Sequence, residues 1–213
     1  ESHRRATKAQ GEGRFKSQIL PIELKSRKGT VTFDTDEHVR SDVSVEGMGK
    51  LRAVFAKESG TVTAGNASGI NDAAAAVVLM EMQAAERAGV KPMARFVSYG
   101  HAGIDPKIMG LGPVSAVKAA LAKANLKIAD MDVIESNEAF AAQAMAVSQQ
   151  LDFDPAKVNP NGGAVALGHP IGATGAILTV KAMYELQRTN GRYALITMCI
   201  GGGQGIAAVI ERM

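Results

Sequence analysis

The sequence has little cysteine, no long apolar run and no strong excess of charge, and each shortage excludes a class of protein. Cys199 is the single cysteine among 213 residues, so the chain can form no internal disulfide, and we expect a cytoplasmic protein. No apolar run reaches the ~18 residues that a membrane span needs. The net charge is +3 without a block of like charges, which argues against a nucleic-acid partner.

Two other shortages concern metals and the start of the chain. His3, His38, His101 and His169 are scattered, whereas structural zinc sites draw on several Cys or His at short spacing, so we expect no metal. The first residues are polar and do not form a signal peptide. Because the sequence does not begin with Met, we expect it to start within a longer polypeptide.

The sequence divides into two regions, a loop-rich one over residues 1–60 and a regular one after them. Residues 1–60 are charged and interrupted by glycines, and they predict a loop-rich region with a small sheet over Ile19–Leu24 and Thr30–Phe33. They show no long helical period. Beyond them helical and strand patterns alternate, so that helices are expected over 72–88, 113–125, 138–151 and 172–189, and strands over 94–99, 131–135, 163–167, 193–198 and 206–210. This order predicts a layered α/β domain whose last two strands are antiparallel.

Polar or reactive side chains stand at three strand ends or turns of this α/β region. Asn137 follows the strand that ends at Glu135, and it either caps the next helix or takes part in a site. His169 lies in a glycine-rich stretch just before a helix, where it is either a buried, hydrogen-bonded residue or an acid–base group. Cys199 precedes a glycine tract, and it is either a small core residue or a thiol that acts beside an oxyanion-binding turn.

Together the three positions indicate acyl-group chemistry. An amide, an imidazole and a thiol at the ends of one sheet's strands suit a reaction in which a carbonyl oxygen gains charge and a carbon loses a proton. The glycine tract at 201–205 lacks the Gly-x-Gly-x-x-Gly spacing of a dinucleotide site, and the stretch around His169 lacks the Gly-Lys-Ser/Thr of a phosphate-binding loop.

At these residues the sequence resembles the thiolase family. Asn137–Phe140, Gly168–Pro170 and Cys199–Gly205 are similar to three thiolase signatures in the family's order and spacing. Asn66–Asp72 resembles a fourth motif and Asp105–Pro113 a fifth. The resemblance covers essentially the whole chain and is nearest to bacterial acetyl-CoA acetyltransferases and broad-range 3-ketoacyl-CoA thiolases.

The resemblance implies a fold and a set of domains. Thiolases are nearly twice as long as this chain, so it resembles their C-terminal half, with the nucleophilic cysteine in the missing N-terminal half. The implied fold is a mixed five-stranded sheet covered by helices, beside the end of a loop-rich domain. Residues 1–69 would complete the loop domain that binds coenzyme A (CoA), 70–92 would supply a helix to the N-terminal domain, and 93–213 would form the C-terminal domain. We expect residues 70–92 to expose an apolar face when that half is absent.

The resemblance also implies roles for single residues. Cys199 would move the proton of acetyl-CoA, and His169 would activate the missing nucleophile and, with a water held by Asn137, stabilise the thioester oxyanion. The N–H of Gly201 would form part of a second oxyanion hole. CoA or its acyl group would be bound by residues of several motifs: Arg40, Ala64, Ser68, Gly69, Met109, Ala139 and Phe140. From the residues alone, Arg40 is equally a solvated surface charge, and Met109 and Phe140 are equally core residues.

The implied activity is that of an acyltransferase, which condenses an acyl-CoA with acetyl-CoA or cleaves a 3-ketoacyl-CoA with CoA. It needs no cofactor beyond CoA as substrate or product, and we expect the fragment to be inactive without its N-terminal half. A dimer or tetramer is the implied assembly. One alternative is a non-catalytic module for CoA binding or assembly, and another is a ketoacyl synthase. The set of Asn137, His169 and Cys199 favours the thiolase.

Overall fold

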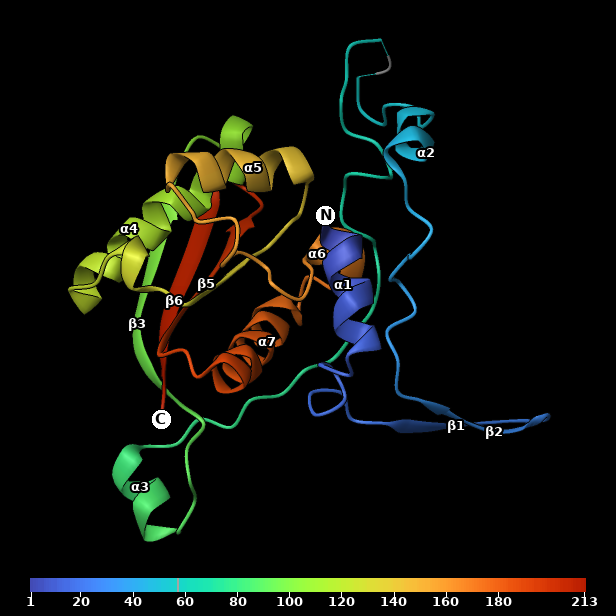
Figure 1. Cartoon of the computed structure of the whole chain (residues 1–213). Coiled ribbons are helices and arrows are strands. Elements are labelled where there is room, and N and C mark those ends of the chain that lie inside the picture. Colours follow the sequence, from blue (N-terminus) through green and yellow to red (C-terminus); the bar gives the residue numbers. More distant parts are fainter. Residues whose placement is uncertain (57) are drawn as a thin grey trace.

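The computed structural model describes residues 1–56 and 58–213, so that position 57 of the expected loop domain lies outside the described residues. Its centre is a mixed four-stranded sheet with the order β3-β6-β5-β4 (Figure 1). The strands are β3 (Ala94–Gly103), β4 (Val133–Ser136), β5 (Tyr193–Ile200) and β6 (Gln204–Arg212). β4 and β5 are parallel, whereas β6 runs antiparallel to both β3 and β5. The predicted antiparallel pair at the end of the chain is therefore confirmed.

Helices cover both faces of this sheet. α4 (Gly112–Ala124) and α5 (Ala141–Gln150) lie on one face, and α7 (Thr174–Thr189) lies on the other (Figure 1). Because side chains alternate along a strand, neighbouring residues of β5 enter different cores. Leu195 packs with Val117 and Val147 beneath α4 and α5, whereas Ile196 packs against Leu178 of α7. The expected layered α/β architecture is confirmed.

The fifth strand, predicted over 163–167, is not formed there, and a single bridge at another position extends the sheet instead. Val158 pairs in parallel with Ile134 of β4, at the edge of the sheet. Two backbone hydrogen bonds flank this bridge, from Ile134 N to Lys157 O and from Asn159 N to Ile134 O. The sheet thus continues by one residue pair beyond β4.

Three of the secondary-structure predictions are wrong. The stretch 163–167, predicted as a strand, forms the short helix α6 (Ala164–Leu167). The predicted helix over 72–88 is reduced to α3 (Met82–Arg87), and residues 72–81 are non-helical and exposed. Most helical stability comes from tertiary packing, and this apolar stretch has no surface to pack on among the described residues. In the loop-rich region, helix α1 (Ser2–Gly11) was missed because only Ala6 and Ala9 are buried, too narrow a stripe for the pattern to detect.

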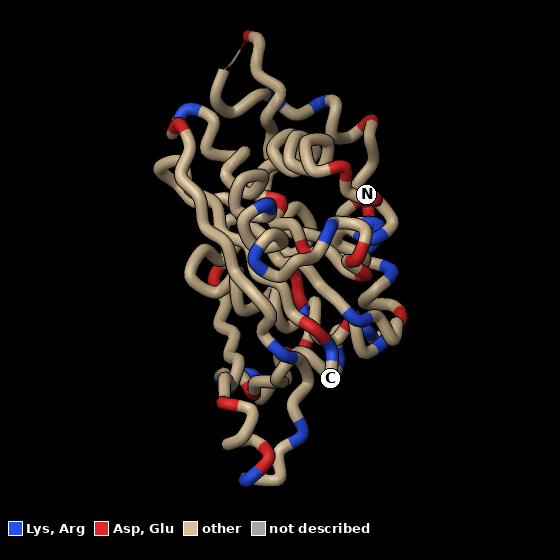
Figure 2. The backbone as a smooth tube through the Cα atoms, turned by 90° about the vertical axis from the view of Figure 1, so that its left-hand side faces the viewer, with Lys and Arg blue, Asp and Glu red and all other residues tan. Residues whose placement is uncertain are grey.

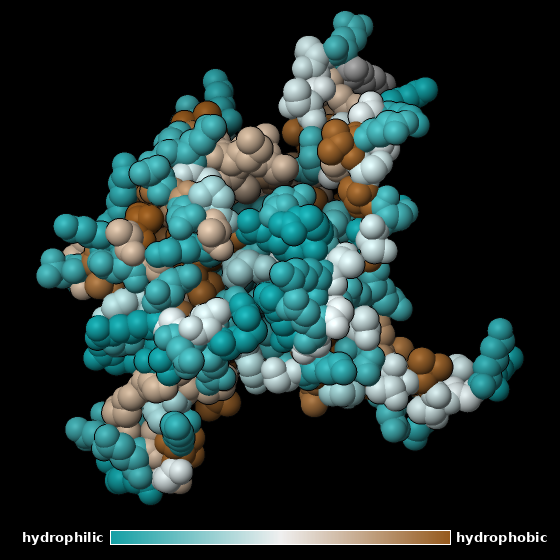
Figure 3. Space-filling view, viewed as in Figure 1, coloured by the Kyte–Doolittle hydropathy of each residue, from teal (hydrophilic) through white to brown (hydrophobic). Residues whose placement is uncertain are grey.

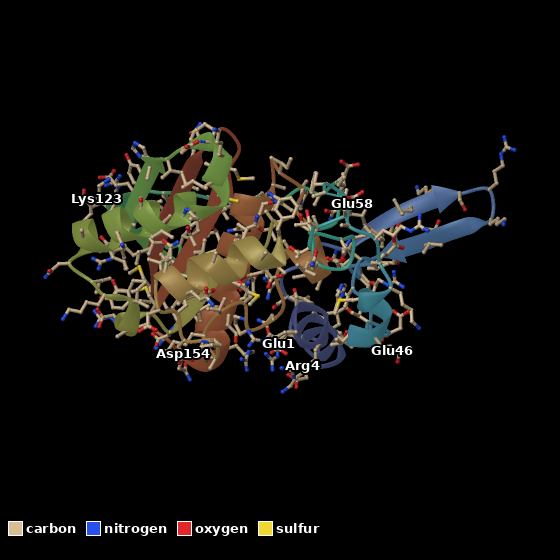
Figure 4. All side chains as sticks on the ribbon, turned by 90° about the horizontal axis from the view of Figure 1, so that it is seen from above. Glu1, Arg4, Glu46, Glu58, Lys123 and Asp154 are labelled. Carbon is tan, nitrogen blue, oxygen red and sulfur yellow. The ribbon has the colours of Figure 1, made fainter. Side chains whose placement is uncertain are left out.

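The first third of the chain is extended in shape. β1 (Ile22–Ser26) and β2 (Gly29–Phe33) form the predicted small sheet, an antiparallel hairpin that projects from the body (Figures 1 and 4). Helix α2 (Val45–Gly49) lies in the loop region that follows, and α1 packs beside α6. Seen from above, Glu46 and Glu58 lie on this loop-rich side, away from Lys123 and Asp154 at the far end of the sheet domain (Figure 4).

Two short 3-10 helices, η1 (Pro106–Leu111) and η2 (Ile128–Asp130), complete the described elements. Acidic and basic positions are interspersed along the chain (Figure 2). Within the described residues, no helix combines the length and the apolar character that crossing a bilayer requires.

Candidate active site

Asn137 is held at the carboxyl end of β4, beside β5. Its backbone N–H donates to Thr197 O (2.9 Å), two residues before Cys199. The preceding residue, Ser136, is clamped by the side chain of Asn159, whose Oδ1 accepts from Ser136 N (2.9 Å) and whose Nδ2 donates to Ser136 O (2.8 Å). The backbone that carries Asn137 is therefore fixed from both sides.

The side chain of Asn137 is buried but has unused hydrogen-bonding capacity. It is 1% exposed, and neither its Oδ1 nor its Nδ2 has a hydrogen-bond partner among the described residues. Burying an unpaired polar group costs ~1–3 kcal/mol, so its retention needs a reason. Helix capping is not that reason, because α5 begins at Ala141 with Phe140 at its N-cap position. The amide is thus available to a ligand or an ordered water.

Glu138 joins the Asn137 turn to the segment that carries His169. Its carboxylate accepts hydrogen bonds from Ser2 Oγ (2.8 Å), Val165 N (3.1 Å) and Asn159 Nδ2 (3.2 Å). Val165 lies in α6, which ends directly before Gly168 and His169. The three donors come from α1, α6 and the turn after Val158, so one carboxylate fixes three segments relative to Asn137.

His169 follows a glycine whose conformation few other residues could adopt. Gly168 has φ +84°, and the Asn71 amide occupies the space where a Cβ at Gly168 would lie. The His169 N–H donates to Gly69 O (3.2 Å), and its Nδ1 lies 2.7 Å from Thr174 Oγ1. Burial lowers the pKa of His169 from its usual 6.5, because the charged form loses solvation. The imidazole is therefore neutral at neutral pH.

Cys199 lies near the end of β5, opposite Gly205 of β6. Its side chain is 7% exposed, and burial raises the pKa of the thiol above its usual 9.0. The residue is thus a protonated thiol at neutral pH in this chain, and not a thiolate of lowered pKa. The turn that follows uses Gly202 and Gly203 at φ +84° and +86°, and Gly201 at its start is exposed.

The Asn66–Asp72 motif is joined directly to the Asn137 turn. Ala67 forms an antiparallel bridge with Phe140, and Ser68 N donates to Ala139 O (3.0 Å). The next residue, Gly69, accepts the hydrogen bond from His169 N. Three sequence motifs that are distant along the chain, at 66–72, 137–140 and 168–170, therefore meet.

The η1 segment, which contains Met109, docks against two parts of the site. The Gln143 side chain of α5 donates to Gly110 O (3.1 Å), and Gly112 and Gly205 approach so closely that a Cβ on either would overlap the other's backbone. Met109 directly precedes these two attachments and is half-buried. Phe140 meets the ring of Phe55 edge to face at 6.2 Å. Phe55 is 73% exposed and had no signal in the sequence.

Arg40 is not brought to these residues. Its guanidinium is exposed and pairs with Asp42 (3.3 Å), and Ala64 is exposed as well. In the same segment, His38 donates its Nδ1–H to Ala166 O (2.7 Å), and a Cβ at Gly69 would overlap its ring. His38 thus fastens this segment beside the His169 turn. The roles of Arg40 and Ala64 in CoA binding stay predictions.

For residues 1–56 and 58–213, no group of three or more His, Cys, Asp or Glu side chains is placed to hold a metal ion. A shallow pocket of about 310 Å³ lies beside the His169 turn, lined by Asn71–Ala75 and Pro170–Ala173. Residues 71–75, which form one wall of this pocket, belong to the extended and mostly exposed segment before α3. The pocket is therefore open on that side.

Two family models match the chain. The model described as "Thiolase, C-terminal domain" matches residues 90–212, and the one described as "Thiolase, N-terminal domain" matches residues 1–83. Together they span nearly every residue. The division of the chain at 69 and 92 that the motifs suggested is not tested by these matches and stays a prediction.

Curated relatives are similar to this chain over its whole length. The chain is 68% identical over 213 residues to the beta-ketothiolase BktB of Cupriavidus necator and 51% identical over 212 residues to the acetyl-CoA acetyltransferase of Shinella zoogloeoides. Each match covers 100% of this chain and 54% of the relative. The chain thus spans about half the length of these relatives.

Solved structures of similar proteins superpose closely on the whole of this chain. The acetyl-CoA acetyltransferase of Bacillus anthracis superposes with a TM-score of 0.96 at 48% identity, over 100% of this chain and 54% of that one. Human mitochondrial 3-ketoacyl-CoA thiolase in complex with CoA superposes with a TM-score of 0.91 at 44% identity, over 100% and 52%.

Proposed function

Because this chain belongs to the thiolase family, we propose that it is the C-terminal part of an enzyme that makes or breaks a carbon–carbon bond between acyl-CoA units. The reaction is the condensation of an acyl-CoA with acetyl-CoA, or the reverse thiolysis of a 3-ketoacyl-CoA. The observation that carries the proposal is the set of backbone hydrogen bonds that gathers the Asn137, His169 and Ser68 turns at the end of the sheet where Cys199 lies.

Cys199 serves as the acid and base at the α-carbon of acetyl-CoA. Its protonated, buried thiol is suited to give a proton to the enolate released by thiolysis. In the condensation direction the thiolate takes the same proton, and the N–H of Gly201 helps to stabilise the enolate oxygen. One such oxyanion donor typically contributes ~10²–10³-fold to the rate.

His169 and Asn137 serve the thioester of the incoming acyl unit and the nucleophile. The neutral imidazole of His169 accepts the proton of a nucleophilic cysteine that the other half of the enzyme supplies. The unpaired amide of Asn137 holds a water that, together with His169, stabilises the thioester oxygen.

CoA is the substrate or product, and no other cofactor is involved. The segments around Arg40, Ala64 and Ser68–Gly69 bind its nucleotide and pantetheine parts, and Met109, Ala139 and Phe140 line the acyl pocket. The similarity to a human thiolase solved with CoA supports this proposal. The partner is the N-terminal half of the same enzyme, which acts in the cytoplasm as a dimer or tetramer.

The test uses the complete polypeptide that contains this chain, assayed for CoA-dependent thiolysis of acetoacetyl-CoA and 3-ketovaleryl-CoA. Cys199→Ala and His169→Ala should each abolish turnover. His101→Ala removes an exposed imidazole on β3 and should leave turnover nearly unchanged. Near-normal activity in either of the first two variants would remove that residue from the mechanism, and an inactive wild-type polypeptide would contradict the proposed function.

A further inference from the structure

We propose that Thr174 is a positioning residue that fixes the tautomer of His169, with the proton on Nδ1 and the lone pair on Nε2. The two residues are five positions apart, at the start of α7 and in the turn before it. The tautomer follows from the hydrogen bonds of these residues alone, whereas its catalytic consequence rests on the function proposed above.

The direction of the hydrogen bond follows from counting protons. A threonine hydroxyl has a single hydrogen to donate, and a carbonyl oxygen can only accept. Thr174 Oγ1 lies 3.0 Å from Pro170 O and donates to it, so its hydrogen is used. The same oxygen lies 2.7 Å from His169 Nδ1, and with its hydrogen directed to Pro170 O it accepts from an Nδ1–H. A neutral imidazole with its proton on Nδ1 has its lone pair on Nε2.

Both partners are held in place by further contacts. Thr174 is 2% exposed, and its backbone N–H also donates to Pro170 O (3.0 Å), so the hydroxyl sits in the first turn of a 16-residue helix. The His169 backbone is tied to Gly69 O. The ring is thus bonded at Nδ1, and Nε2 is the nitrogen left to meet a reacting group.

The tautomer decides what His169 can do. With the lone pair on Nε2, the ring can take a proton from a thiol and afterwards offer that N–H to an oxyanion. With the proton on Nε2 instead, the ring can donate but cannot act as the base there. Removing the outer hydrogen-bond partner of a metal-binding histidine typically costs ~10–100-fold in affinity or activity, and we expect a loss of that order for this metal-free imidazole.

Thr174→Val keeps the branched shape of the side chain and removes the hydroxyl. In the complete polypeptide labelled with ¹⁵N-histidine, wild-type His169 should give a pyrrole-type Nδ1 and a pyridine-type Nε2 signal, identified by their loss in His169→Gln. Thr174→Val should shift both signals toward a mixture of tautomers and lower kcat by ~10–100-fold. Thr174→Ser restores the hydroxyl and should restore both the signals and kcat.

Thr179→Val is the matched control, because Thr179 Oγ1 makes the same type of bond to the carbonyl four residues back, Gly175 O (2.8 Å), without touching His169. It should change neither the ¹⁵N signals nor kcat. A pyrrole-type Nε2 in the wild type, or unchanged His169 signals in Thr174→Val, would overturn the inference. The ¹⁵N spectra decide this even if the polypeptide has no thiolase activity, so the failure of the inference and that of the proposed function can be told apart.

Discussion

At the scale of single residues, Asn159 contributes most to the shape of the site without being a candidate for the chemistry. It adopts a left-handed conformation (φ +44°) and is 3% exposed. Its side-chain Oδ1 and Nδ2 both form hydrogen bonds with the backbone of Ser136. Asparagine tolerates this conformation better than most residues, and its amide is the group that mimics a strand partner here.

Asn159→Ala should therefore destabilise the complete polypeptide by ~2–4 kcal/mol, since it leaves two buried backbone groups unpaired and adds strain. Asn190→Ala is the control, because Asn190 has a similar left-handed conformation (φ +55°) at the end of α7 without such a clamp. It should cost only ~1 kcal/mol. Urea unfolding measures both, and equal losses would mean that the hydrogen bonds to Ser136 contribute nothing.

At the scale of elements, helix α7 is tied to the turn before α6 by a buried carboxylate. Glu185 accepts from Asn161 Nδ2 (2.8 Å) and from Arg188 Nε (2.8 Å), and Asn161 also accepts from Arg14 (2.7 Å). Burial alone would raise the pKa of Glu185. The hydrogen bonds from Arg188 and Asn161 outweigh burial, so that the pKa lies below its usual 4.5.

A carboxylate whose pKa is lower in the folded state stabilises the protein above its unfolded pKa, and the stabilisation is lost as the pH falls through the folded value. Glu185→Gln should thus reduce the free energy of unfolding at pH 7, and the difference from wild type should shrink below pH 4.5. Glu46→Gln, at an exposed position in α2, controls for the loss of a negative charge. A difference between wild type and Glu185→Gln that stays constant from pH 7 to pH 3.5 would contradict the assignment.

The elements also show which parts of this structure the sequence could predict. The prediction of a helix over 113–125 was correct, because Pro113 marks the first turn of the helix and its apolar residues recur with helical spacing. The prediction of a helix over 72–88 was wrong for most of its length. An apolar segment needs a surface to pack on before its helix is stable, and this one has none among the described residues. The three motif residues were identified at turns or strand ends, which are local features.

What could not be predicted is how those turns are joined. The bonds from Asn159 to Ser136 and from Ser2 to Glu138 connect residues 23 and 136 positions apart, and they arise only once the chain has folded. The bond between His169 and Thr174 spans five residues and was within reach of local reasoning. The left-handed conformation of Asn159 also has a local mark, the Asn-Pro-Asn-Gly turn at 159–162.

At the scale of the whole molecule, apolar side chains remain uncovered on two projecting parts. One face of the β1–β2 hairpin carries Ile22, Leu24, Val31 and Phe33, which are 42–64% exposed, with polar residues on the opposite face. The extended segment before α3 exposes Val78 (88%) and Leu79 (82%). The space-filling surface is hollowed between α3 and the hairpin, with apolar patches on both (Figure 3).

A two-stranded hairpin is marginally stable in water without packing, and exposed apolar stretches mark interfaces. The relatives of this chain are nearly twice its length, and under the proposed function the other half of the enzyme would cover these surfaces. We therefore expect the 213-residue chain to self-associate when it is produced alone and to become monodisperse when the other half of the polypeptide is present.

Val78→Asp tests whether the extended segment before α3 causes the self-association of the isolated chain. The side chain is solvated in the isolated chain, so the charge should reduce self-association there, as measured by light scattering. In the complete polypeptide we expect the other half to cover this position, so that a buried, unpaired carboxylate should lower the melting temperature by several degrees. Met145→Asp places the same charge at a 62% exposed site on α5 and should have neither effect. If the complete polypeptide melts normally with aspartate at position 78, this segment stays in solvent. If the isolated wild-type chain is monodisperse and melts cooperatively, these surfaces need no partner.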